Sequence, residues 1–338
     1  MASKFLSTAI VLGCIQSLLW GLQHPFQAPI YGTHGGSLTS IAFLNVFGSL
    51  FVLFFFSGRL FFLRRTVFLR EIISQPNVPL WLGLHAIFSI ASLYLYAFGQ
   101  NRLGDPVLVA LVTLVSPFAA IIFATNAHLS LKEILAGFTS GEFARTLVFH
   151  LFLTLLVIVF IFLTREMGSG NFDIPGLLSI LLVPFLFFAS YFLVVRYFYY
   201  RPTHLSKQDI SIYKTASCVF FISSSAMNLG VSIIIVLLSN YDFLELGAGL
   251  NLTNIALYLF GVLATSCLGS LWYFYTYRFK TRGEATFYYH SVPIFSAIIA
   301  LPISFLADFG YSYTNYLATF VFLTVIVVAI HIFKRKYR

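Results

Sequence analysis

The chain has 338 residues, of which 59% are hydrophobic and only 9% charged, with a mean hydropathy of +0.91 and a formal net charge of +9. Because soluble domains carry roughly 25% charged residues, this composition excludes an ordinary soluble fold. The basic residues stand singly in short segments between apolar stretches, which excludes a nucleic-acid footprint and favours contact with anionic lipid head groups.

Ten apolar stretches fill nearly the whole chain, and each has the ~20 residues that a helix needs to cross the hydrocarbon core of a bilayer. The first lacks a small-residue cleavage site, so we expect it to remain as a spanning helix. We predict an all-α polytopic membrane protein with ten transmembrane helices, at 5–23, 39–58, 80–99, 106–125, 146–164, 174–195, 216–238, 254–276, 285–306 and 313–333.

The basic residues predict the orientation of these helices. If the N-terminus is cytoplasmic, 18 of the 20 Lys and Arg residues fall on the cytoplasmic side, and only Arg102 and Arg165 remain outside. The positive-inside rule therefore predicts that both termini are cytoplasmic. We expect the protein in the cell (inner) membrane, in contact with membrane lipids.

A weak internal repeat divides the chain into two halves. The fourth stretch contains Ser-Pro-Phe-Ala-Ala-Ile-Ile-Phe-Ala at 116–124, and the ninth contains Val-Pro-Ile-Phe-Ser-Ala-Ile-Ile-Ala at 292–300. Each is the fourth of five stretches, and because five is odd the second copy enters the membrane from the opposite side. This predicts two inverted five-helix repeats, 1–170 and 171–338, with a substrate site near the midplane as in many secondary transporters.

The repeated segments carry a resemblance to a known family. The chain resembles the ten-helix EamA-like branch of the drug/metabolite transporter superfamily through Trp20-Gly21 in its first helix, the segments that begin at Pro117 and Pro293, and the nearby acids Glu133 and Asp308. The resemblance implies a central cavity that opens alternately to either side, lined mainly by the first, third, fourth, sixth, eighth and ninth helices. It implies no particular substrate. Stretches 146–164 and 313–333 lack the glycines that usually pack the fifth helix against the tenth.

Polar residues inside the membrane are the candidates for lining such a cavity, because each is costly there. No Asp, Glu, Lys or Arg lies in the middle third of any predicted helix, so histidine is the remaining candidate proton carrier. Gln16, Trp20 and His24 recur at helical spacing and share one face of the first helix. His24 fits a cavity wall and an interfacial anchor equally well.

Further candidates lie in both halves. His85 and Tyr94 belong to the third helix, and Tyr289 and His290 precede Pro293, which leaves a carbonyl near residue 289 without its helical partner. Pro117 is the matching proline of the first half. His290 suits either the cavity or a packing contact with a carbonyl. Asn45 and Asn228 match in position between the two halves, and interhelical hydrogen bonding explains them as well as substrate contact does.

Aromatic residues crowd the inner ends of the sixth and eighth helices, where Tyr191 and Trp272 lie. Most such residues are interfacial anchors, but any that face the cavity suit a planar ring or an organic cation. This favours an amino acid, a nucleobase-bearing metabolite or an S-adenosyl compound over a phosphorylated sugar.

We predict a secondary transporter that moves a small organic metabolite by alternating access, as a facilitator or exchanger because membrane carboxylates are missing. The alternatives are a lipid or lipid-linked flippase on the same fold and a proton-coupled efflux carrier for organic cations. Paired aspartates and His-Glu-x-x-His patterns are absent, so we predict no enzyme, and we expect no cofactor, metal site or nucleic-acid partner. The three cysteines lie within predicted helices as packing residues. A homodimer is compatible with the sequence.

Overall fold

The computed structural model describes most of the chain between its second and eighth predicted helices. The described residues are 37–62, 77–103, 141–166, 173–200, 210–239 and 252–272, with isolated residues or short stretches within 15–31, 72–74, 109–136 and 299–332.

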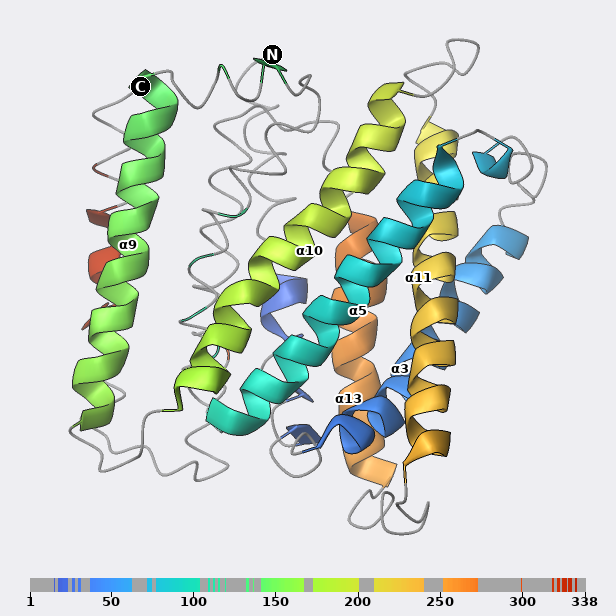
Figure 1. Ribbon diagram of the computed structural model, residues 1–338, viewed down its shortest axis with the longest axis horizontal. Helices are drawn as coiled ribbons and strands as arrows, with labels where there is room; N and C mark the ends of the chain where they lie inside the picture. The colour runs from blue at the N-terminus through green and yellow to red at the C-terminus, as the bar shows by residue number, and fades with distance from the viewer. Residues whose placement is uncertain are drawn as a thin grey trace.

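Helices make up nearly all of the described residues, and these contain no strand. The long elements are α3 (Leu38–Phe62), α5 (Val78–Leu103), α9 (Gly141–Glu166), α10 (Ile174–Tyr200), α11 (Ile210–Leu238) and α13 (Leu252–Val262), which continues as the π-helix η2 (Leu263–Gly269) (Figure 1). They correspond to the predicted helices at 39–58, 80–99, 146–164, 174–195, 216–238 and 254–276. The prediction of a helix is confirmed for each of these six stretches.

Five helical segments within the described ranges are long and apolar enough to cross a membrane. They are Leu38–Phe62, Val78–Leu103, Ile174–Val194, Thr215–Leu238 and Leu252–Trp272. This architecture fits an α-helical polytopic membrane protein. The predicted helices at 5–23, 106–125, 285–306 and 313–333 lie largely outside the described residues, so their number and the division at residue 170 stay predictions.

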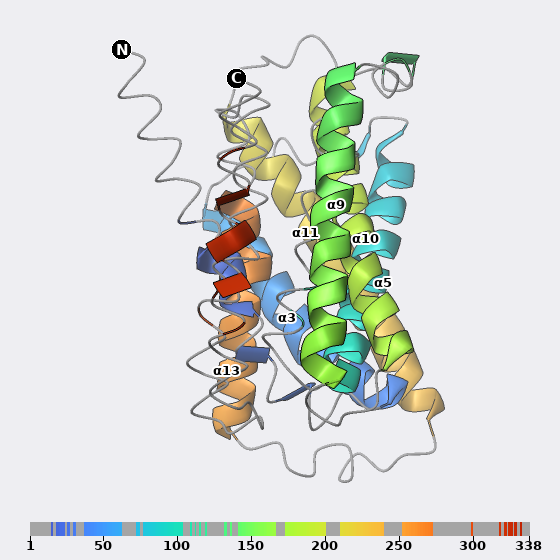
Figure 2. The same cartoon turned by 90° about the vertical axis from the view of Figure 1, so that its left-hand side faces the viewer.

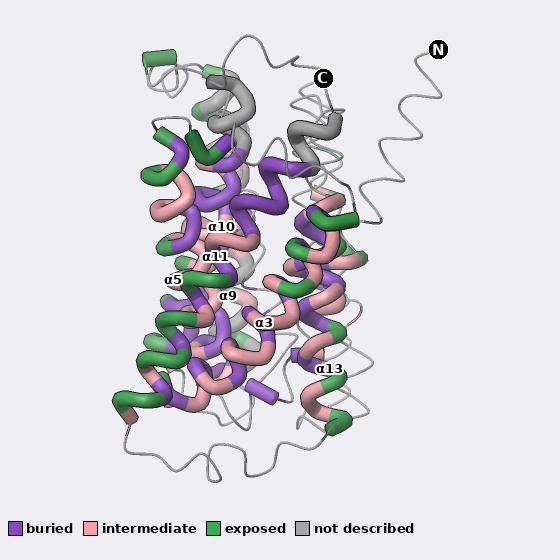
Figure 3. Tube along the Cα trace, turned by 90° about the vertical axis from the view of Figure 1, so that its right-hand side faces the viewer, coloured by how far each residue is buried: buried purple, intermediate pink, exposed green. Residues whose placement is uncertain are grey.

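Side-chain exposure agrees with a lipid surround. Large apolar side chains are exposed on several helices, among them Phe54 (72% exposed), Leu80 (62%) and Leu237 (69%). Apolar area left exposed to water costs about 25 cal/mol per Å² relative to burial. Lipid tails cover the same area without that cost. The exposed turns of α5 lie along the outer edge of the bundle in Figure 3.

Two helix pairs form the centre of the bundle: α5 packs on α10, and α3 packs on α11. Glycines permit a close α5–α10 crossing. A Cβ on Gly99 would lie 2.6 Å from Ile180 Cγ1, and one on Gly176 would lie 2.7 Å from Arg102 Cβ. Small residues at a crossing allow helix backbones to approach in a membrane. Figure 1 shows α5 and α10 running side by side along most of their length.

Polar groups define the start of α10. The Asp173 carboxylate accepts a hydrogen bond from the Gly176 backbone N–H at 2.8 Å, the N-cap arrangement that satisfies a free amide of the first turn. Its other oxygen lies 3.4 Å from the Arg102 guanidinium, and Arg102 also covers the Phe98 ring at 5.3 Å. The last turn of α5 and the first turn of α10 are therefore joined at one end of the bundle.

The helix α9 stands at one edge of the bundle (Figures 1 and 2). Its Phe160 ring stacks on the ring of Phe322 with centroids 4.0 Å apart and planes 8° apart. Phe160 belongs to the predicted fifth helix and Phe322 to the predicted tenth. An aromatic pair thus joins these two stretches, in which the sequence has no glycine.

Candidate functional site

A cavity of about 220 Å³ lies inside the bundle, between α3, α5, α10, α11 and the continuous α13–η2 segment. Described residues near the first predicted helix close one side. The residues that line it are Trp20, Gln23, Gln27, Asn45, Gly48, Ser49, Val52, Ser89, Ile90, Ser92, Leu93, Tyr96, Val183, Pro184, Phe187, Phe188, Tyr191, Phe221, Ser224, Ser225, Asn228, Tyr258, Val262, Thr265, Ser266 and Ser270.

The polar part of the wall lies where α3 meets α11. Asn45 and Ser49 are one turn apart on α3, and Asn228 on α11 donates a hydrogen bond from Nδ2 to Ser49 Oγ at 2.7 Å. Asn45 Oδ1 accepts from the hydroxyl of Tyr258, on α13, at 3.5 Å. These bonds join three helices through buried side chains, so the polar wall is held in place before any solute enters.

Three carboxamide side chains at the cavity also have an atom with no hydrogen-bond partner in the described part of the chain. These atoms are Gln27 Oε1, Asn45 Nδ2 and Asn228 Oδ1. The three side chains are almost completely buried, with 2%, 0% and 6% of their surface exposed. A buried polar atom without a partner costs about 1–3 kcal/mol, which a hydrogen bond to a solute or to water would recover.

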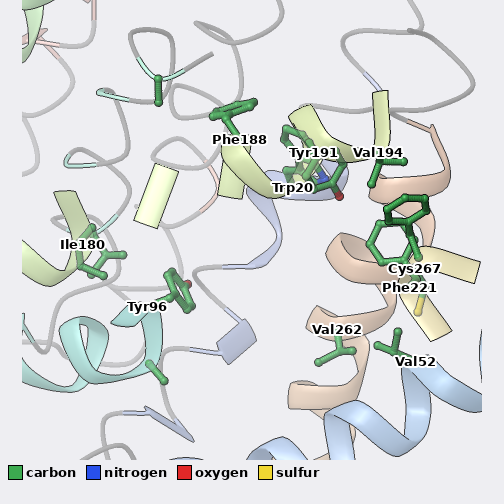
Figure 4. Packing of buried hydrophobic residues seen from close by; sticks show 14 of the residues in the cluster. Trp20, Val52, Tyr96, Ile180, Phe188, Tyr191, Val194, Phe221, Val262 and Cys267 are labelled. Carbon is green, nitrogen blue, oxygen red and sulfur yellow. The ribbon is translucent and has the colours of Figure 1, made fainter. Parts of the chain in front are cut away.

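A second part of the wall is aromatic. The indole of Trp20 lies edge-on to Phe187 and Tyr191 of α10, with ring centroids 5.3 and 6.3 Å apart. The Tyr191 hydroxyl hydrogen-bonds Ser270 Oγ, which follows η2. Trp20 and Tyr191 lie side by side in Figure 4. This wall joins the first predicted helix to the sixth and the eighth.

The π-helix η2 provides another part of the wall. Its last residue, Gly269, allows the Trp20 indole to approach, because a Cβ there would lie 2.5 Å from Trp20 Nε1. Thr265 Oγ1 donates to the Gly261 carbonyl at 2.8 Å, and Ser270 Oγ donates to the Thr265 carbonyl at 3.3 Å. Single-turn π-helical segments inside α-helices are frequent at functional sites.

The structure places five of the predicted site residues. Trp20 and Tyr191 line the cavity. His85 lies behind it, buried between the rings of Phe220 and Phe221, with Nδ1 hydrogen-bonded to Ser89 Oγ at 3.2 Å.

Tyr94 and Trp272 are likewise not among the lining residues. The Tyr94 hydroxyl bonds Ser232 Oγ at 3.0 Å and so joins α5 to α11. Trp272 is half-buried at the end of its helix. The other predicted site residues lie outside the described residues; they are Gln16, His24, Pro117, Tyr289, His290 and Pro293.

The carboxamides were not among the predicted site residues, although Asn45 and Asn228 were noted as equivalent positions. Spacing is the feature that could have identified them. Ser224, Asn228 and Ser232 recur every fourth residue of α11, and Asn45 and Ser49 have the same spacing on α3, so each set shares a helix face. The structure shows that Asn45 and Asn228 both bond across helices and line the cavity.

The cavity wall carries no charged side chain among its described residues. Nowhere in the described part of the chain do three His, Cys, Asp or Glu residues gather as metal ligands would. The chemistry of the described wall is therefore that of amides, hydroxyls and aromatic rings.

Comparison with known proteins supports the fold alone. No protein-family model matches the chain, and no curated protein matches it. Among the solved structures, one described only as a crystal structure of a protein superposes with a TM-score of 0.51 at 15% sequence identity. The superposition covers 98% of this chain and 99% of the other. The two chains thus share an overall fold.

Proposed function

We propose that the chain is a secondary transporter for a small organic metabolite that works by alternating access as a facilitator or exchanger. The proposal places it in the ten-helix EamA-like branch of the drug/metabolite transporter superfamily, with inverted repeats at 1–170 and 171–338. Both termini are cytoplasmic and the host membrane is the cell (inner) membrane.

One observation carries the proposal: a cavity with several polar groups in its wall lies inside a bundle whose outer surface is apolar. Polar groups are expensive within a membrane, and where they gather around an internal space they mark a solute pathway. Small-molecule sites are mostly apolar with a few convergent polar groups, and this cavity has that composition.

Helix pairing supports the inverted repeat. In two five-helix repeats, each helix has its counterpart five positions further on. The counterpart of the second helix (α3) is the seventh (α11), and these two pack on each other. By the same rule, a contact between the third and sixth helices should be matched by a contact between the eighth and first. The former is the α5–α10 contact, and the latter is the contact of Trp20 with Gly269. The cavity lies among these pairs, where the proposal requires the substrate site.

The test is uptake by proteoliposomes that contain the purified full chain. Labelled amino acids, nucleobases and nucleosides, S-adenosyl compounds and quaternary cations would each be offered with and without a pH gradient. A facilitator or exchanger gives saturable uptake of one class that the gradient does not change and that the same unlabelled compound inside accelerates. Uptake that follows the gradient would instead support the proton-coupled alternative.

A matched pair of variants connects uptake to the cavity. Ser224→Phe places a ring in the cavity wall, so we expect uptake to fall to background. Met227→Phe places the same ring on the exposed face of the same helix, where Met227 is 40% exposed, so uptake should persist. Equal loss in both variants, or in neither, would contradict transport through this cavity.

A further inference from the structure

Resting on the proposed function, we propose that the cavity selects an uncharged, planar solute that presents a hydrogen-bond donor beside an acceptor. The lactam edge of a nucleobase has this pattern. The sequence favours three substrate classes: amino acids, nucleobase-bearing metabolites and S-adenosyl compounds. Charge, hydrogen bonding and size together select the nucleobase class.

Charge argues against the zwitterionic and cationic classes. An ion taken out of water pays several kcal/mol unless an opposite charge or metal compensates it. The described cavity wall offers no charged side chain, and no Asp, Glu, Lys or Arg lies in the middle third of any predicted helix of the whole chain. An amino acid would bury two such charges, and an S-adenosyl compound or quaternary cation at least one.

The free amide atoms specify the hydrogen-bonding pattern. Asn45 Nδ2 is a donor and needs an acceptor on the solute, whereas Asn228 Oδ1 and Gln27 Oε1 are acceptors and need N–H groups. A quaternary cation supplies neither a donor nor an acceptor, and an amino acid supplies them only as charged groups. A lactam supplies both as neutral groups at neighbouring atoms, which is the pattern that Asn45 and Asn228 call for.

The same side chains are held in position by their other atoms. Asn228 is tied to Ser49, Asn45 accepts from Tyr258, and Gln27 lies against Gly261, where a Cβ would be 3.0 Å from Gln27 Cγ. Fixed partners reduce the ordering cost of binding. The wall is thus prepared for one arrangement of donors and acceptors.

The aromatic wall and the size of the cavity complete the match. Rings of Trp20, Phe187 and Phe188 line it, and stacking of a base on an aromatic ring contributes about 1–3 kcal/mol. The volume of about 220 Å³ is below the ~300–1,000 Å³ of pockets for drug-sized ligands. A single ring system suits this space better than a nucleotide sugar or a lipid.

The test measures binding separately from transport. Purified full-length protein in detergent is titrated with labelled uracil and hypoxanthine, and with leucine, S-adenosylmethionine and tetraethylammonium. We expect saturable binding of at least one nucleobase and none of the charged compounds. Asn228→Leu should weaken nucleobase binding about tenfold, as expected for the loss of one buried hydrogen bond.

Gln100→Leu is the matched control. Gln100 is 1% exposed, and neither of its amide atoms has a partner among the described residues, but it does not line the cavity. Its replacement should change the dissociation constant less than about twofold, because residues that do not share a partner affect each other only weakly. Asn228→Ala removes the same acceptor without adding a bulky side chain, so it tests the same position if the leucine variant does not fold. It should also weaken binding.

The outcomes separate the two proposals. Binding of leucine, S-adenosylmethionine or tetraethylammonium without nucleobase binding overturns the substrate class and leaves transport standing. Nucleobase binding that Asn228→Leu and Gln100→Leu reduce equally overturns the assigned site. No nucleobase binding up to saturating solubility also overturns the inference. Nucleobase binding without uptake into proteoliposomes overturns the transport function and leaves the binding site.

Discussion

The contact between Gly269 and Trp20 offers a sharp test of the site geometry. A Cβ at Gly269 would lie 2.5 Å from both Cδ1 and Nε1 of the indole and 3.0 Å from the Ala264 carbonyl oxygen. Heavy atoms attract best at about 3.5–4.0 Å, so Gly269→Ala requires the indole to move by about 1 Å. Trp20 has little room for this, because it is 8% exposed and lies against Phe187.

Two opposing contributions determine the magnitude. Overpacking of a filled interior costs about 1–3 kcal/mol, and replacing glycine by alanine within a helix returns about 1 kcal/mol. We therefore expect Gly269→Ala to lower the free energy of unfolding by about 0–2 kcal/mol. Gly230→Ala is the control, because nothing lies within 4 Å of a Cβ on Gly230 and the helical gain remains.

The assay is denaturant unfolding of both variants in the same mixed micelles, followed by tryptophan fluorescence and repeated with uptake measurements. Gly269→Ala should be less stable than Gly230→Ala by about 1–3 kcal/mol and should reduce uptake, since the displaced indole lines the cavity. Equal stabilities would show that Trp20 does not rest on this turn.

Three further predictions concern single contacts. Asp173→Asn keeps an acceptor for the Gly176 amide and loses only the ion pair with Arg102, which is 51% exposed, so the free energy of unfolding should fall by less than about 1 kcal/mol. Asp173→Ala also loses the helix cap and should cost about 1 kcal/mol more. Equal losses in the two variants would contradict the cap. Tyr191→Phe and Ser270→Ala should show a coupling of about 0.5–1.5 kcal/mol in a double-mutant cycle of unfolding, and strict additivity would mean that their bond contributes nothing. His85→Leu removes the unpartnered Nε2 together with the bond between Nδ1 and Ser89 Oγ, so the free energy of unfolding should change by less than about 1 kcal/mol and uptake should persist; loss of uptake would place His85 in the pathway.

Helix positions could be predicted because they depend on local composition. The stretches at 39–58 and 80–99 are apolar for long enough to span a bilayer, and α3 and α5 extend each by only a few residues at either end. The π-helical turn at Leu263–Gly269 could not be predicted this way. Its residues have ordinary helical composition, and its place in the site depends on the contact of Gly269 with Trp20, far away in the sequence.

Two of the predicted site residues, Trp20 and Tyr191, line the cavity. Helical spacing with Gln16 and His24 indicates Trp20, and the aromatic residues at the inner end of the sixth helix indicate Tyr191. Histidine is a candidate because it titrates, but the ring of His85 packs against phenylalanines, a role that composition does not distinguish from a cavity role. The sequence does not separate the two roles of Asn45 and Asn228, because both roles require the same buried polar side chain.

The two roles of Asn45 and Asn228 are connected by the membrane itself. Apolar side chains gain little by leaving lipid for a helix interface, so helices in a bilayer associate through close packing and hydrogen bonds. One atom of each carboxamide makes such a bond, to Ser49 or to Tyr258, and the other atom has no partner in the described part of the chain. A solute that bonds these two atoms would contact α3 and α11 at once. The two helices come from opposite halves of the chain. In the proposed transporter, the residues that join α3 to α11 would thus also bind the solute, and this would connect occupancy of the cavity to the helix movement that alternating access needs.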